Sequence, residues 1–248
     1  VNEVTKGTHL IGVPEEAAMI NFDYQGTESR QHVMVLSTGR CGTVSLYHLF
    51  KESNLEPYHT YWFTQHSDRR WEFMCRLATG NHSASLIEEW MNIRRAEWMG
   101  EKPMIGLNHS DTVYAPIFAA VHPNARFIYL RRNREDVFNS FVKKDQWAGG
   151  INHFYPVMYD IGEKYSFSLP MVDDVAGTNW HLDYTEAFCR TFGNVMGDRF
   201  CEISADKLFA QDTSEISKLL EFTGSDIPLS YAVEHFKNKI NEKAHKLC

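Results

Sequence analysis

Short apolar runs alternate along the chain with segments whose apolar residues fall at helical spacing. The run His32–Ser37, followed by a glycine-rich turn, has the length of a buried strand. The segment after it is apolar at positions 46, 49 and 50, the spacing of one helix face. By the same criteria we predict strands at 32–37, 103–108, 125–130 and 199–203, helices at 44–50, 113–121, 184–196 and 214–222, and a helix that begins after Asn133.

Two helix boundaries carry their own signals. Asn133 is a favourable N-cap residue, and Glu135 and Asp136 follow in the first turn, where the helix dipole favours negative charge. Gly224 follows the apolar stripe of 214–222 and suits a helix end. These signals place the start of one helix at 134 and the end of another before 224.

Other segments lack a clear period. Residues 1–31 are polar and glycine-interrupted, so we expect an irregular leader. Residues 57–100 hold four of the six tryptophans and are expected to be mostly helical from 68 onward. Residues 146–183 are rich in glycine and aromatics and are predicted to form a long loop with room for one short helix. The last twenty residues are expected to form a basic tail.

Alternation of strands and helices is typical of a parallel sheet with helices on both faces. No internal repeat and no low-complexity linker divides the sequence. We therefore expect an α/β fold, with residues 1–248 forming a single domain around a central, mostly parallel sheet.

Composition limits the partners and the cellular location that we expect for the protein. The 248 residues are 43% hydrophobic with a net charge of −7, which argues against nucleic acid as a partner, so any anion site must be local. The five cysteines are scattered and form no C-x-x-C pair, which suggests reduced thiols and a cytoplasmic location. We expect neither a signal peptide nor a membrane span, since no apolar run approaches about 18 residues.

Three predicted strands end in polar residues. The polar segments are Ser37–Arg40, Asn108–Ser110 and Arg131–Asn133. Because the carboxyl ends of parallel strands share one edge of the sheet, we expect these residues to line one cleft.

The first of these turns has the chemistry of a phosphate cradle. Its glycines free backbone N–H groups at a helix start, while Arg40 adds charge and Thr43 and Ser45 add hydroxyl donors. It is not an ATP-type loop, since no lysine follows Gly42. A tight turn with a solvated arginine remains the alternative for this segment alone.

A second anion site is suggested by Arg132 at the end of the third strand and Ser140 two helical turns later. Arginine suits forked contacts with phosphate oxygens. Two such sites on one edge imply a ligand with separated anionic groups.

These motifs resemble those of sulfotransferases that use 3′-phosphoadenosine 5′-phosphosulfate (PAPS). Residues 35–46 resemble the family's 5′-phosphosulfate loop, and residues 127–140 resemble its 3′-phosphate motif. Leu107-Asn108-His109 is similar to the segment that supplies a catalytic histidine, and residues 199–224 are similar to the family's closing strand and helix. The resemblance implies a P-loop-NTPase-like fold of the sulfotransferase type, closest to divergent bacterial and polysaccharide-type members.

The chain also departs from the family pattern. Cys41, Val44 and Arg134 replace the usual serine, threonine and proline, and Leu107 replaces a lysine. The C-terminal Arg-Lys-Gly segment of cytosolic members is missing.

The resemblance implies sulfuryl transfer from PAPS to a hydroxyl or amine, with 3′-phosphoadenosine 5′-phosphate (PAP) as product and no metal. His109 would be the base, and Arg40 would stabilise the leaving group. The acceptor would be a small molecule or a saccharide. The implied cofactor-binding residues are Arg40, Cys41, Gly42, Thr43, Val44, Ser45, Arg132 and Ser140.

Two other functions stay open from the sequence. One is a nucleotide or small-molecule kinase, although we find neither its lysine nor its magnesium ligands. The other is a non-catalytic module that binds PAP.

Overall fold

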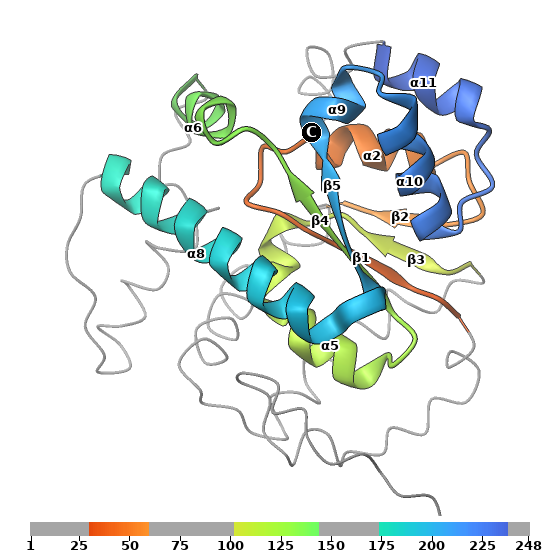
Figure 1. Cartoon of the computed structure of the whole chain (residues 1–248), viewed down its shortest axis with the longest axis horizontal. Coiled ribbons are helices and arrows are strands. Elements are labelled where there is room, and N and C mark those ends of the chain that lie inside the picture. Colours follow the sequence, from red (N-terminus) through yellow and green to blue (C-terminus); the bar gives the residue numbers. More distant parts are fainter. Residues whose placement is uncertain (1–29, 60–101, 144–173, 238–248) are drawn as a thin grey trace, which may run out of the picture.

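Five parallel strands form the centre of the structure, with helices on both faces (Figure 1). The computed structural model describes residues 30–59, 102–143 and 174–237. Within these residues the strand order is β2-β3-β1-β4-β5. The strands are β1 (Val33–Leu36), β2 (Glu56–Tyr58), β3 (Met104–Gly106), β4 (Arg126–Arg131) and β5 (Phe200–Ser204). The α/β prediction with a parallel sheet is confirmed.

The helices connect these strands and close the sheet on both sides. The α-helices are α2 (Thr43–Phe50), α5 (Ala115–Val121), α6 (Arg134–Lys143), α8 (Asp174–Met196), α9 (Ala205–Phe209), α10 (Thr213–Thr223) and α11 (Leu229–Lys237). Two 3₁₀ helices, η1 (His109–Tyr114) and η2 (Gly197–Arg199), precede α5 and β5. No helix among the described residues is both long and apolar enough to cross a membrane.

Side-chain alternation along β4 shows how the two faces are filled. Phe127 packs edge-on against Phe118 of α5 and Phe192 of α8. Ile128 and Leu130 point the other way, into the core cluster that includes residues of α2, α9 and α10. Figure 1 accordingly shows α5 and α8 on one face and α2, α9, α10 and α11 on the other.

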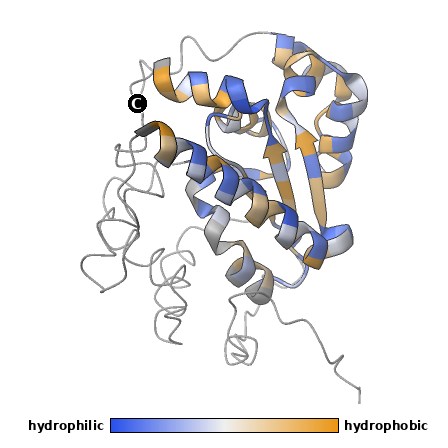
Figure 2. Ribbon diagram, turned by 60° about the vertical axis from the view of Figure 1, so that its left-hand side comes forward, coloured by the Kyte–Doolittle hydropathy of each residue, from blue (hydrophilic) through white to orange (hydrophobic). Residues whose placement is uncertain are grey.

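Strand β1 lies at the centre of the sheet and is buried along its whole length. A strand covered on both faces has no polar side, which is why its sequence is a continuous apolar run. Figure 2 shows the same contrast, with hydrophobic residues concentrated on the strands and both kinds of residue mixed along the helices.

The two helix boundaries that carry their own sequence signals agree with the structure. The Asn133 side chain accepts hydrogen bonds from the backbone N–H groups of Glu135 and Asp136, so it caps α6 as expected. Gly224 ends α10 in the left-handed conformation, with φ of 67°.

The predicted loop at 146–183 is wrong in its last ten residues, because α8 begins at Asp174 and not at Tyr184. The buried face of this added part includes Thr178, His181 and Leu182, at helical spacing. Two of these three residues are polar, so a hydrophobic period does not reveal the helix.

Three short elements were not predicted. Strand β2 has three residues, includes a proline and pairs with β3 alone, which fits an edge strand. Helix α9 has five residues, too few to show a period. Helix α11 occupies part of the predicted basic tail and buries Ala232 and Phe236, one turn apart.

Several expectations lie outside the described residues. They are the leader up to residue 29, the helical region from 68 to 100, the loop from 146 to 173 and the tail beyond 237.

Candidate active site

The turn between β1 and α2 has an unusual backbone. Gly39, Arg40 and Gly42 all lie in the left-handed region, with φ of 81°, 58° and 98°. Glycine adopts this conformation freely, whereas an L-residue such as Arg40 pays roughly 1–2 kcal/mol for it. The geometry curls the chain around its own N–H groups, as in anion-binding nests.

Contacts from two other elements hold the start of this turn. The Ser37 N–H donates to Thr112 Oγ1 at 3.1 Å. The Thr38 carbonyl accepts a hydrogen bond from His181 Nε2 of α8 at 2.8 Å. Burial lowers the pKa of His181, so the neutral imidazole is the form that holds the turn.

The start of α2 presents backbone donors. Its first bond to the turn runs from the Leu46 N–H to the Gly42 carbonyl at 3.2 Å, and no side chain caps the helix. Among the described residues, the N–H groups of Thr43, Val44 and Ser45 have no acceptor. Unpaired N–H groups and the helix dipole make such a terminus attractive to an anion.

The two hydroxyls predicted to bind phosphate already have partners. Thr43 Oγ1 lies 3.2 Å from His59 Nε2, at the end of β2. Ser45 Oγ lies 3.4 Å from His235 Nε2 of α11, and this nitrogen also donates to the Ser45 carbonyl at 2.9 Å. Both residues are buried, with exposed fractions of 6% for Thr43 and 4% for Ser45, so neither hydroxyl is freely accessible.

The Cys41 thiol points into the core. It is 1% exposed, and its Sγ donates to the Gly39 carbonyl at 3.2 Å. Burial raises the pKa of Cys41 to about 11, so the thiol stays protonated. Only the backbone of this predicted binding residue can face a ligand.

Arg132 and Ser140 lie on the same rim as the first turn. The Arg40 Nε donates to Ser140 Oγ at 3.0 Å. The Arg132 Nη1 donates to the Arg40 carbonyl at 3.1 Å. The two predicted anion motifs, about ninety residues apart in sequence, are thus in direct contact.

The two guanidinium groups affect each other. Burial lowers the pKa of Arg40, and the nearby Arg132 charge lowers it further. Arginine nevertheless remains protonated in proteins, so both charges persist. Within the described residues, the buried Arg132 Nε has no hydrogen-bond acceptor. Two adjacent cations with an unsatisfied donor favour an anionic ligand.

His109 lies beside the first turn. It follows β3 and begins η1, and its imidazole faces the Cα of Gly39. A Cβ at position 39 would come within 3.1 Å of His109 Cδ2, so glycine permits the close approach. The structure therefore brings the predicted base against the predicted phosphate loop.

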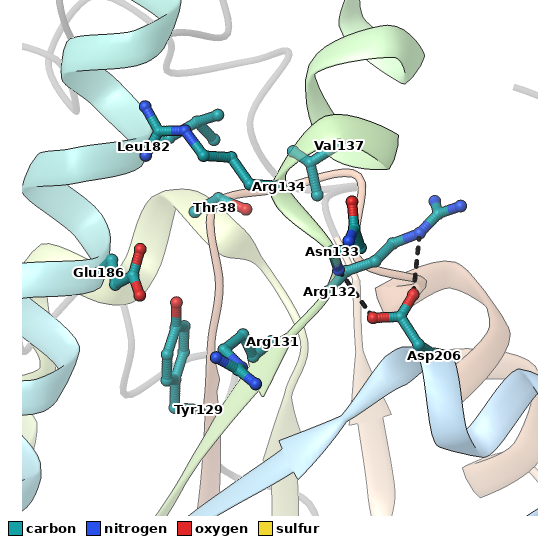
Figure 3. Close-up of a pocket in the computed structure, with 10 residues that line it drawn as sticks. All are labelled: Thr38, Tyr129, Arg131, Arg132, Asn133, Arg134, Val137, Leu182, Glu186 and Asp206. Carbon is teal, nitrogen blue, oxygen red and sulfur yellow. Dashed lines mark hydrogen bonds and ion pairs between the residues drawn. The ribbon is translucent and has the colours of Figure 1, made fainter.

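A cleft of about 240 Å³ opens between the end of β4 and helix α8 (Figure 3). Arg131, Arg132 and Arg134 supply positive charge to it, and Glu186 and Asp206 supply negative charge. Thr38, Tyr129, Asn133, Val137 and Leu182 complete its lining. Within the described residues, no group of three or more His, Cys, Asp or Glu side chains could hold a metal ion.

Four residues at the site were not predicted from the sequence. The two anion motifs are contacted by His59 directly after β2, by His181 of α8, and by Asp206 and Phe209 of α9. Asp206 follows the end of β5 and could have been found by the rule that places strand ends on one edge. For the other three residues, no local sequence pattern indicates a place at the site.

A family model described as a sulfotransferase domain matches residues 32–166, more than half of the chain. This range covers the first turn, His109 and the Arg132 motif. No curated protein matches the sequence.

Solved structures agree with this match at the level of the fold. The sulfotransferase domain of the Synechococcus PCC 7002 olefin synthase aligns with a TM-score of 0.52 and 13% identity, covering 81% of this chain and 75% of that one. The sulfotransferase domain from the curacin biosynthetic pathway gives a TM-score of 0.51 and 11% identity, with coverage of 82% and 76%. A sulfotransferase from Mycobacterium avium aligns with a TM-score of 0.50 and 12% identity, covering 84% of this chain and 67% of that one.

Proposed function

Because this chain belongs to the sulfotransferase domain family, we propose that it transfers a sulfuryl group from PAPS to a hydroxyl or amine acceptor. The observation that carries the proposal is the contact between the two anion motifs through Arg40, Ser140 and Arg132. A ligand with two separated phosphate groups requires two cationic sites on one rim. No metal ion is needed for this chemistry.

The residues fit a nucleotide with phosphates at both ends. The open N–H groups at Thr43, Val44 and Ser45 suit the 5′-phosphate. Arg132, whose Nε has no acceptor among the described residues, suits the 3′-phosphate together with Ser140. When bound, PAPS would supply an activated sulfuryl group.

In this proposal each side chain has a limited task. His109 takes the proton of the acceptor, because an imidazole is suited to exchange protons near neutral pH. Arg40 stabilises the negative charge that develops on the departing phosphate oxygen, as preorganised cations do in other group transfers. The hydrogen bond from Arg40 Nε to Ser140 Oγ orients the guanidinium.

The test is a transfer assay with ³⁵S-labelled PAPS and a panel of acceptors that includes phenols, alcohols, amines and saccharides. We expect label in at least one acceptor class and release of PAP in equal amount. A thermal-shift titration accompanies it, in which PAP should stabilise the protein without added metal. Stabilisation by ATP with Mg²⁺ and not by PAP would reject the proposal in favour of a kinase. Binding of PAP without transfer to any acceptor would favour a non-catalytic module.

A further inference from the structure

Helix α9 contacts both anion motifs. Its last residue, Phe209, lies so close to Gly42 of the first turn that a Cβ there would come within 2.5 Å of the ring. Its second residue, Asp206, faces Arg132 and Asn133 of the second motif (Figure 3). A helix of five residues thus spans the two halves of the site.

The Asp206 carboxylate makes two different contacts. Its Oδ2 accepts a hydrogen bond from the Asn133 backbone N–H at 2.7 Å, which fixes the chain directly after Arg132. Its Oδ1 lies 3.8 Å from the Arg132 Nε, within range for charge attraction but too far for a hydrogen bond. Asp206 therefore holds the backbone at Asn133 by a hydrogen bond. It attracts the Arg132 guanidinium without accepting a hydrogen bond from it.

Within the part of the chain that the structure describes, most donors of Arg132 have no acceptor. Of the five N–H groups of a guanidinium, Nη1 uses one for the Arg40 carbonyl. The Asp136 carboxylate lies 3.8 Å from Nη2, again beyond hydrogen-bond range. The buried Nε has no acceptor among the described residues. The group is oriented by two nearby carboxylates and keeps its donors for a ligand.

The anchor of Asp206 is itself well supported. Ser204 caps α9 by accepting a hydrogen bond from the Lys207 N–H at 3.3 Å. The Ser204 N–H donates to the buried Glu215 of α10 at 2.7 Å, and Ala205 is 1% exposed. The carboxylate is therefore carried by a fixed part of the fold.

We propose that Asp206 is a positioning residue, which holds Arg132 and the start of α6 so that the second motif can bind the 3′-phosphate of the nucleotide. This inference rests on the proposed function and adds to it a residue that the two motifs do not contain. Asp206 does not contact the reacting atoms, and it acts through Arg132.

The experiment compares two nucleotides by isothermal titration calorimetry. PAP carries the 3′-phosphate, and adenosine 5′-phosphate lacks it, so the ratio of their dissociation constants isolates the second motif. For Asp206→Ala we expect PAP affinity to fall about tenfold, the scale of a lost charge-assisted hydrogen bond, and the affinity for adenosine 5′-phosphate to change less than about twofold. The PAP affinity of Asp206→Asn should lie between those of the wild type and Asp206→Ala, since the amide oxygen can still accept from the Asn133 N–H but carries no charge.

Asp212→Ala is the matched control. Asp212 caps α10 by accepting from the Ser214 and Glu215 N–H groups, the same chemistry on the neighbouring helix, and contacts neither Arg132 nor Asn133. It should reduce stability without changing the ratio of the two affinities.

The outcomes separate the two proposals. Equal weakening of both nucleotides by the Asp206 variants, no weakening, or tighter PAP binding would overturn the positioning role while leaving the proposed function intact. If Asp206→Ala does not fold, the ratio of the two dissociation constants measured for Asp206→Asn tests the positioning role by the same criteria. A wild-type protein that binds no PAP would overturn both.

Discussion

Arg40 combines three features in one residue. Its backbone is left-handed, its carbonyl accepts from Arg132, and its side chain donates to Ser140. This left-handed residue is thus in contact with both residues of the second motif, Arg132 and Ser140. Non-glycine residues in this conformation cluster at functional sites, where the surrounding structure holds them. The loop thus shapes the second motif as well as the first.

Substitutions at Arg40 and His109 should change a different kinetic constant from a substitution at Arg132. Arg40→Ala and His109→Ala are expected to reduce kcat about 10²-fold or more, since each removes a group that acts in the transition state. Arg132→Ala should mainly raise the KM for PAPS, because its role is binding. Initial-rate kinetics over a range of PAPS concentrations distinguish the two effects.

Arg126→Ala is the control for these variants. Arg126 lies at the other end of β4, donates to the Phe222 carbonyl at 2.8 Å and is remote from the rim. Its kinetics should match the wild type. Unchanged turnover in the His109 variant would remove His109 as the base.

At the scale of elements, the site depends on how α2 and α9 pack. Gly42 is both the N-terminal boundary of α2 and the point where Phe209 of α9 approaches the backbone. The helix terminus that offers its N–H groups to an anion is therefore formed jointly by two helices far apart in sequence.

Gly42→Ala tests this packing, with Gly197→Ala as its control. Both glycines have positive φ, so both alanines pay roughly 1–2 kcal/mol of backbone strain. Only at 42 does the added Cβ meet another group, whereas nothing lies within 4 Å of it at 197. We expect Gly42→Ala to lose about 1–3 kcal/mol more in free energy of unfolding, measured by urea denaturation. Equal losses would mean that the Phe209 ring moves aside without cost.

Across the whole molecule, the two edges of the sheet differ in chemistry. The carboxyl edge carries Arg40, Arg132 and His109. The amino edge carries a buried pair, His32 and His122, whose rings lie 5.0 Å apart and contact Phe118. His32 Nδ1 accepts a hydrogen bond from the Met104 N–H at 3.1 Å, which requires that nitrogen to be unprotonated.

This pair should make stability depend on pH. Burial lowers the pKa of His32 to about 4, with a further effect of Arg30, and burial followed by the charge of His32 lowers that of His122 to about 3. In the unfolded chain both titrate near 6.5. The unfolded state therefore binds more protons below that pH, and stability falls as the pH drops from about 6.5 toward 4.

Between pH 7.5 and 5.5 we expect these two histidines to cost up to about 3 kcal/mol in the free energy of unfolding. His122→Phe should reduce that loss by about 1 kcal/mol, measured by urea denaturation at both pH values. The same pH dependence in wild type and variant would contradict this account.

The sequence predicted four of the five strands that the structure describes, and it placed both predicted anion motifs at strand ends, where the structure has them. It could do so because a strand buried on both faces must be apolar throughout. A glycine turn before a helix and an asparagine cap are also recognisable from the residue types at those positions alone. It did not reveal β2, α9, α11 or the first turns of α8. Strand β2 and helix α9 are too short, and the first turns of α8 too polar on their buried side, for a hydrophobic period to appear, whereas α11 lies in the segment whose lysines indicated a basic tail.

What the sequence determined by itself is therefore local: apolar runs, turns, caps and the resemblance to sulfotransferases. Only the tertiary structure decided that Arg40 touches Ser140 and Arg132, that His109 packs on Gly39, and that Asp206 and Phe209 brace the site from α9. These contacts join residues up to about 170 positions apart. Their partners are set by strand order and helix packing, which depend on the whole chain burying its apolar surface at once.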